Sequence, residues 1–335
     1  MSIVLVRKVS LPEDDPIILA ADRMAPRIRQ AFLDAIDAVR SQVTVRRIAD
    51  AVEQGDAGRV MELLNVQGRL SAAFGGAGLS ASVSNVRSAL QDTFRAGAQA
   101  ALESLPSRIG TDLAFNLLNP EAVRFLDSYT FDLIQQVTQE TRDAIQAIII
   151  RSFREGGSPL EQARQIRDVI GLTARQEVAV DNFRNALSSG MSSDLRTALD
   201  RSLRDGRYDR TLLSALRNDR PLAQAQIDRM VERYRQRYLQ YRARTIARTE
   251  SIRASNKGQR ELWRQAVHQG LIPGTARRKW IVSGDERTCA ICLDLEDEER
   301  GLDEEFAPGI MEPPDPHPDC RCSLGLVAAS LRRAA

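Results

Sequence analysis

Four cysteines and one histidine in the last part of the chain have the types and spacing of metal ligands. Cys289 and Cys292 are separated by two residues, and His317, Cys320 and Cys322 follow after an acidic segment. Every cysteine of the protein lies in this region. Two thiols at this spacing can bind one ion from a tight turn, and a second cluster can complete its coordination. The pattern therefore predicts a metal site, with Zn²⁺ as the expected ion.

Structural zinc takes four ligands, so we expect four of these five candidates to bind it. Cys289 and Cys292 belong to every alternative. If the second cluster lies on a regular strand, Cys320 and Cys322 share one face and give a four-cysteine site. Otherwise His317 binds together with one of them. Three or four thiolates leave no open coordination position, so the ion is expected to stabilise the fold rather than to catalyse a reaction.

The rival interpretations of the cluster fit the sequence less well. A nucleobase-deaminase site needs a His-x-Glu motif before its Pro-Cys-x-x-Cys, and none precedes Cys289. The only earlier histidine is His268, which Gln269 follows. The chain also has no His-Glu-x-x-His motif and no Cys/His pair with plausible triad partners. We therefore expect no enzymatic activity and no small-molecule substrate, and a metal-dependent enzyme is the less favoured alternative.

Length and composition indicate a globular protein with two or three domains. The 335 residues are 43% hydrophobic and 27% charged. No apolar run approaches the roughly 20 residues that cross a bilayer, and no signal peptide is evident, so we expect no membrane anchor. We expect the chain to be made in the cytoplasm, where reduced thiols favour a metal over disulfides. The net charge of +2 argues against a protein that coats nucleic acid.

Apolar residues at three- and four-residue spacing make the first two-thirds of the chain helical. Asn119 and Pro120 start a helix, and the long helical pattern from about Asp127 runs to Glu155. Ser158 and Thr173 each begin a capping box and open the next two helices. The predicted fold class is mainly α, with an extended multi-helix body and a small C-terminal α+β metal-stabilised domain. The expected regions are an N-terminal helical region (1–115), a helical middle region (116–220) and the long helix with the metal-binding domain (221–335).

The longest helical pattern runs from Leu222 to about Gln269. Its expected apolar stripe is made of Ile227, Val231, Tyr234, Tyr238 and Tyr241. Arginines on its flanks could contact DNA or a partner, and the candidates are Arg233, Arg237 and Arg244. Bases can stack on tyrosine rings while guanidiniums bind phosphates, so a DNA-binding module is an alternative function. Core spacing of the tyrosines favours instead a buried stripe with a solvated basic face.

After this helix the pattern changes to a small mixed unit. Residues Lys279 to Ser283 are predicted to form a strand, Gly284 and Asp285 a turn, and Cys320 to Val327 a second strand. The core of such a unit is small, and a bound metal would supply the missing stability.

An ordered set of motifs in this chain resembles the phage head morphogenesis proteins of the Mu F-like type, the minor head proteins encoded beside the portal. The motifs are the helical stretch Phe125 to Leu172 with Gly157-Ser-Pro-Leu-Glu161, then Ala247-Arg-Thr-Glu250, Lys279-Trp280, Asp285-Glu-Arg-Thr-Cys-Ala-Ile-Cys292, and Pro314 to Cys322 with His-Pro-Asp-Cys-Arg-Cys. Together they cover roughly residues 120–327. The two cysteine-containing motifs are the specific ones.

The resemblance implies a minor head (capsid) protein of a tailed phage or prophage, located in the virion at the portal vertex. It implies a role in head assembly, DNA packaging or DNA delivery, with the portal protein and other head proteins as partners and packaged DNA as a further candidate. Arg248, Thr249 and Glu250 match a family motif, and we hypothesise that they form a network linking the long helix to the metal domain. We also expect no toxin-like C-terminal domain of the kind that some relatives carry, because the sequence stops at Ala335.

Overall fold

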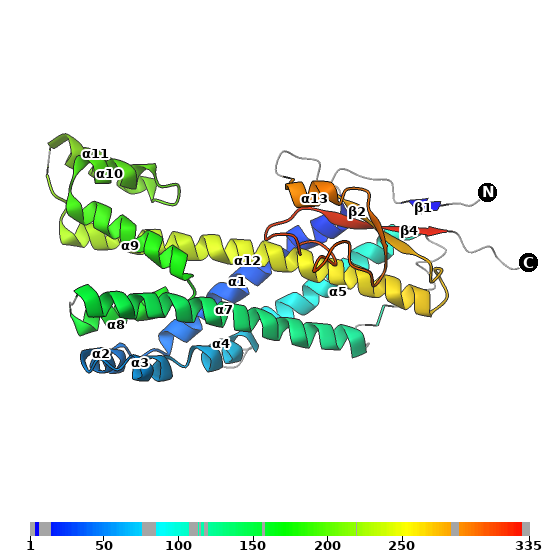
Figure 1. Ribbon diagram of the computed structural model, residues 1–335, viewed down its shortest axis with the longest axis horizontal. Coiled ribbons are helices and arrows are strands. Elements are labelled where there is room, and N and C mark those ends of the chain that lie inside the picture. Colours follow the sequence, from blue (N-terminus) through cyan, green and yellow to red (C-terminus); the bar gives the residue numbers. More distant parts are fainter. Residues whose placement is uncertain are drawn as a thin grey trace, which may run out of the picture. The chain divides into compact units, whose positions relative to one another are not determined.

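The protein is mainly helical in a computed structural model (Figure 1). The model describes residues 4–6, 15–75, 85–106, 113, 115–116, 120–155, 158–218, 220–282 and 288–329. The helices are α1 (Pro16–Ser41), α2 (Val45–Glu53), α3 (Ala57–Leu64), α4 (Val66–Gly75), α5 (Val86–Ser104), α7 (Pro120–Glu155), α8 (Pro159–Val169), α9 (Ala174–Ser189), α10 (Ser192–Asp200), α11 (Asp209–Asn218), α12 (Gln224–His268) and α13 (Ala290–Asp294), with a 3-10 turn η2 (Gly206–Tyr208). The strands are β1 (Val4–Val6), β2 (Arg277–Ile281), β3 (Glu299–Gly301) and β4 (Ser323–Ala329). In the described part of the chain, no helix is long and apolar enough to span a bilayer.

Contacts divide the chain into two compact units, each made of separate segments. Unit 1 contains residues 1–32, 74–131 and 244–335, and unit 2 contains residues 33–73 and 132–243. The division into regions 1–115, 116–220 and 221–335 stays a prediction about domains, because these units group residues by contact alone.

Several helix boundaries follow from local sequence signals. Thr173 caps α9 with a complete capping box, in which Thr173 accepts from the Gln176 amide and Gln176 accepts from the Thr173 amide, as the sequence predicts. Helix α8 begins at Pro159, but the side chain of Ser158 forms no capping hydrogen bond, so the box predicted there is wrong. Helix α12 runs for 45 residues and confirms the predicted long helix.

Unit 2 buries an apolar core between α9, α10, α11 and the first part of α12. Phe183 and Tyr234 lie at its centre with ring centroids 4.3 Å apart. Elsewhere in unit 2, the Arg40 guanidinium donates to the carbonyl oxygens of Asp168 and Ile170. Asp168 lies in the last turn of α8 and Ile170 is its C-cap, so the arginine satisfies backbone acceptors that the helix leaves unbonded.

Unit 1 is built on a four-stranded antiparallel sheet with the strand order β1-β4-β2-β3. Its core contains Trp280 on β2, Leu324 on β4 and Leu262 on α12, each fully buried. The sequence predicts a small sheet in the C-terminal part, and the structure confirms it. The prediction missed β1, which pairs with β4 through Val4 and Ala329, so the sheet is not made from C-terminal residues alone.

Helices α5 and α12 cross in unit 1 with their backbones in direct contact. A Cβ atom added to Gly97 would lie 2.2 Å from the Ser255 carbonyl oxygen, and one added to Gly258 would lie 2.0 Å from the Phe94 carbonyl oxygen. Only glycine allows so close an approach of two helices, so this crossing fixes α5 against the part of α12 that contains Ser255 and Gly258.

The strand predicted from Cys320 to Val327 is wrong at its start. Strand β4 begins at Ser323, and the two cysteines precede it. Asp319 adopts a left-handed backbone conformation with φ of 62°, which turns the chain immediately before Cys320. Strand β2 begins two residues earlier than predicted and ends at Ile281, while the predicted turn at Gly284 and Asp285 lies outside the described residues.

Candidate metal centre

Helix α13 positions the first two thiols. Cys289 is the N-cap of this short helix, and its Sγ accepts a hydrogen bond from the backbone amide of Cys292 at 3.4 Å. Cys292 is fully buried and belongs to the core of unit 1, whereas Cys289 is half-buried. One helical turn therefore directs both thiols to the same side, which is the geometry that a Cys-x-x-C motif needs to bind one ion.

The segment before β4 brings the other three candidates to Cys292. The Sγ of Cys292 lies 3.7 Å from His317 Nε2 and 3.8 Å from Cys320 Sγ. The ligand atoms form two groups, Cys289-Cys292-His317 and Cys292-Cys320-Cys322, in which all atoms lie within 4.8 Å of one another. Cys292 belongs to both groups. The structure thus brings together all five side chains that the sequence singles out.

These distances fit a tetrahedral ion held by soft ligands. With Zn–S bonds of about 2.3 Å, two thiolates at a tetrahedral angle stand about 3.8 Å apart, and the Cys292 to Cys320 separation has this value. The cavity that they line has a volume of about 220 Å³. All four cysteines are free thiols, and this separation is far longer than a disulfide bond of about 2.05 Å.

His317 is oriented as a ligand through its other ring nitrogen. Nδ1 lies 2.9 Å from the carbonyl oxygen of Pro318. With the proton on Nδ1, the ring donates to this carbonyl and the Nε2 lone pair faces Cys292. Metal-bound histidines commonly use the second nitrogen in this way, because the hydrogen bond fixes both ring orientation and tautomer.

Hydrogen bonds among the three buried thiols, Cys292, Cys320 and Cys322, give them different pKa values. Hydrogen bonds from Cys292 and Cys322 lower the pKa of Cys320 to about 3. The hydrogen bond to Cys320 raises the pKa of Cys292. For Cys322, a hydrogen bond with Cys292 lowers the pKa, but the hydrogen bond with Cys320 and burial outweigh it and raise the pKa to about 12. One thiolate therefore forms readily among the three, whereas a bound divalent cation would ionise the others as well.

Helix α12 holds the ligand-bearing segment through the motif residues Arg248 and Thr249. Arg248 Nε lies 2.7 Å from the Asp319 carboxylate, and Thr249 Oγ1 accepts from the Asp319 backbone amide at 3.0 Å. Asp319 is the residue directly before Cys320. The two α12 side chains therefore fix the turn from which Cys320 reaches the other thiols.

Glu250, the third residue of this motif, has a different environment. Its buried carboxylate lies 3.8 Å from Arg253, which also pairs with Asp315 at 2.9 Å. Among the described residues the Glu250 Oε2 atom has no hydrogen-bond partner. Burial raises the pKa of Glu250 to about 7, and the nearby Arg253 offsets only part of this effect.

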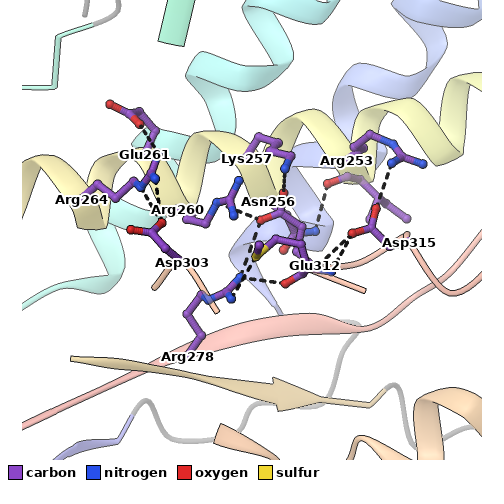
Figure 2. Close-up of polar contacts among 12 residues, drawn as sticks. Arg253, Asn256, Lys257, Arg260, Glu261, Arg264, Arg278, Asp303, Glu312 and Asp315 are labelled. Carbon is purple, nitrogen blue, oxygen red and sulfur yellow. Dashed lines mark hydrogen bonds and ion pairs between the residues drawn. The ribbon is translucent and has the colours of Figure 1, made fainter. Parts of the chain in front are cut away.

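A buried charge cluster that the sequence analysis missed anchors the same segment (Figure 2). Glu312 is fully buried, with Lys257 Nζ at 2.6 Å, Arg260 Nε at 3.3 Å and Arg278 NH1 at 4.0 Å from its carboxylate. Burial lowers the pKa of Arg278 to about 10, which leaves it charged at neutral pH. Glu312 thus lies among three cations, and removing it would leave them without their shared anion.

Arg278 also satisfies the backbone of the loops around it. Its guanidinium donates to the carbonyl oxygens of Gly301 and Met311 at 3.1 and 2.7 Å, and to that of Glu304. Figure 2 shows α12 side chains reaching the same loops, with Arg264 on Asp303 and Arg253 on Asp315. The sequence signal for this contact was present, because the basic residues 253, 257, 260 and 264 follow one another at helical spacing.

The arginine and tyrosine residues of α12 do not form a stacking surface. Tyr234 is buried and Tyr238 is half-buried, while Tyr241 is 54% exposed, which contradicts its place in the predicted buried stripe. Arg233 and Arg237 are exposed, but Arg237 donates to the Arg204 carbonyl oxygen at 2.7 Å. The basic face is not fully solvated either, since Arg235 and Arg242 are buried and Arg242 pairs with Glu140.

Comparison with known proteins agrees with the motifs. The family model described as phage Mu protein F like protein matches residues 143–325, more than half of the 335-residue chain. Searches of curated proteins and of solved structures returned no significant match. The matched range contains the cysteine cluster, His317 and the Arg248-Thr249-Glu250 motif. This chain therefore belongs to the phage Mu protein F-like family, as its motifs predict.

Proposed function

We propose that the protein is a minor head protein of a tailed phage or prophage that acts at the portal vertex, and that a closed metal centre holds its C-terminal segments together. Membership of the phage Mu protein F-like family supports a role in phage head morphogenesis. The observation that carries the metal centre is the convergence of Cys289, Cys292, His317, Cys320 and Cys322 on one small cavity.

The role proposed for the ion is structural, with Zn²⁺ as the expected metal. When bound, it would supply a crosslink between α13 and the segment before β4, two elements that lie on either side of β3 in the chain. Cys292, which belongs to both ligand groups, is the residue expected in every coordination set. Four soft ligands around one ion leave no position for substrate, so we propose no catalytic role.

Metal analysis of reduced, purified protein tests this part of the proposal. We expect about one equivalent of zinc per chain, lost in Cys292→Ser. Single substitutions at the other four candidates identify the ligands, since three of them should lose the metal and one should retain it. His268→Ala is the matched control, because His268 is exposed at the end of α12 outside the cluster. Absence of stoichiometric metal from the reduced protein would refute the metal centre.

The location at the portal vertex needs a separate test. Heads assembled with and without the portal protein can be purified and their content of this chain measured by quantitative mass spectrometry. We expect a few copies per head when the portal is present and none when it is absent. Equal amounts in both preparations would refute association with the portal and leave a more general head protein.

The alternative of a single-strand binding module has little support from the geometry. Base stacking requires accessible rings, and Tyr234 packs on Phe183 inside the core of unit 2. Tyr238 packs edge-on against Tyr234 with centroids 5.0 Å apart. Exposed arginines alone would support only a salt-dependent contact with packaged DNA or an acidic partner.

A further inference from the structure

A hollow on unit 1 lies between α1 and α12, and short side chains and arginines line it. Ala25, Pro26 and Ala247 form part of its lining, and its volume is about 250 Å³. These side chains are too short to fill the space between the two helices. The hollow is open to solvent, so it can accept one group of a larger molecule as well as a small ion.

Three guanidiniums and one carboxylate line this hollow. Arg29 comes from α1, Arg244 and Arg248 come from α12, and Asp22 is the carboxylate. Among the described residues, Arg29 and Arg244 have neither an ion pair nor a hydrogen bond, and both are exposed. Arg248 is mostly buried and pairs with Asp319 at 2.7 Å. Two unpaired guanidiniums therefore line this space, beside a third that Asp319 holds in place.

Asp22 does not neutralise this group. It lies 3.5 Å from Arg248, and its side chain is 46% exposed. Because Asp22 is nearly half exposed and the pair is long, its contribution is small and another anion can replace Asp22. Asp319 and Asp22 both pair with Arg248, but the guanidiniums of Arg29 and Arg244 have no such partner among the described residues, so the hollow keeps an excess of positive charge and attracts anions.

We propose that this hollow binds a phosphate group. A carboxylate is planar with a single charge, and one guanidinium can satisfy both of its oxygens. A phosphate presents several oxygens in different directions and can accept from guanidiniums that approach from separate helices. Arg29 on α1 and Arg244 on α12 provide such an arrangement, with small residues between them. The phosphate could come from a nucleic-acid backbone or from a small phosphate compound, and the two sources can be distinguished by experiment.

The test uses two double variants that remove the same charge. Arg29→Ser/Arg244→Ser removes the guanidiniums of the hollow, and Arg46→Ser/Arg47→Ser removes two exposed arginines from α2. In a third variant, Ala25→Glu, a carboxylate is placed in the hollow while every arginine is retained. The full chain is used throughout, and circular dichroism checks that each variant is folded.

Two probes are measured against chloride at equal ionic strength. Inorganic phosphate is followed by the rise in the midpoint of thermal unfolding, and a short fluorescent DNA duplex is followed by anisotropy. We expect phosphate to stabilise the wild type and the α2 variant, and its apparent affinity to fall at least about tenfold in Arg29→Ser/Arg244→Ser and in Ala25→Glu.

The outcomes separate clearly. Loss of both phosphate stabilisation and duplex binding in the two hollow variants supports the site with a nucleic-acid backbone as its source. Loss of phosphate stabilisation alone supports the site with a small phosphate compound. Equal losses in the hollow and α2 double variants would mean that only net charge matters, and this would overturn the proposal. An unchanged Ala25→Glu variant would overturn it as well.

Discussion

Replacing Glu250 by Gln should stabilise the protein at alkaline pH. Glu250 is buried on α12, its Oε2 atom has no hydrogen-bond partner among the described residues, and its nearest cation is Arg253 at 3.8 Å. An ionised carboxylate in this place loses hydration that the protein does not replace. Glutamine has nearly the same shape and removes the charge, so it imitates the protonated form that the folded state favours.

The magnitude follows from the pKa of Glu250, which burial raises from 4.5 to about 7. Because the folded pKa lies above the unfolded one, the folded state binds the proton more tightly. This contribution to stability is complete below pH 4.5 and is lost as the pH rises through 7. A shift of this size corresponds to about 3 kcal/mol, since one pKa unit is about 1.4 kcal/mol.

Urea denaturation of wild type and Glu250→Gln between pH 5 and pH 8.5 measures this effect. The stability difference between the two proteins cancels the contributions of all other groups, because the two proteins share them. We expect the advantage of the glutamine variant to grow by about 2 kcal/mol from pH 5.5 to pH 8. A difference that does not change with pH would show that Glu250 has an ordinary pKa, and the reasoning from burial would fail.

Three further substitutions test the packing of the two units. Glu312→Gln should cost about 3–5 kcal/mol in urea denaturation, because the buried cations around it lose their shared anion; a cost below about 1 kcal/mol would contradict this. Gly258→Ala should cost about 3 kcal/mol or more, since its Cβ would lie 2.0 Å from a backbone oxygen of α5. The matched control Gly75→Ala has nothing within 4 Å of the added Cβ and should be neutral or slightly stabilising, and urea denaturation measures both variants. Thr173→Ala should cost about 1 kcal/mol through loss of the α9 cap, whereas Thr44→Ala, an N-cap with no side-chain hydrogen bond, should cost little, and equal losses would refute the role of the cap.

The sequence identified the ligand candidates because their chemistry is local. The spacing of Cys289 and Cys292 places both thiols on one turn whatever the rest of the fold does. The position of Cys320 was harder to predict, because the strand begins at Ser323 and the turn at Asp319 is held by Arg248 and Thr249 from a distant helix. A contact between residues so far apart in the sequence cannot be predicted from the short-range spacing of apolar residues.

Long-range burial explains the other failures. Tyr241 continues the spacing of the apolar stripe but is exposed. Periodicity predicts which face of a helix is apolar, but it does not predict how far along the helix other elements pack on that face. The sequence analysis did not single out Glu312, because its burial depends on Lys257 and Arg260 of α12, more than 50 positions earlier in the chain. The basic face predicted beside the tyrosine stripe of α12 is only partly solvated, because Arg235 and Arg242 are buried and Arg242 pairs with Glu140.

The segmented construction of unit 1 has a consequence for the order in which a nascent chain can fold. All contacts of unit 2 are available once residue 243 has been synthesised, whereas unit 1 needs β4, which pairs with β1 from the start of the chain. Pairing of strands so far apart in the sequence is slow, because the chain loses the entropy of closing a long loop before the strands gain any stabilising contact. During translation, α1 and α5 therefore expose the apolar surfaces that α12 and the sheet cover in the folded protein. Exposed apolar surface of this kind favours aggregation. Unit 1, with the thiol cluster, is therefore expected to form after unit 2 and only once β4 has left the ribosome.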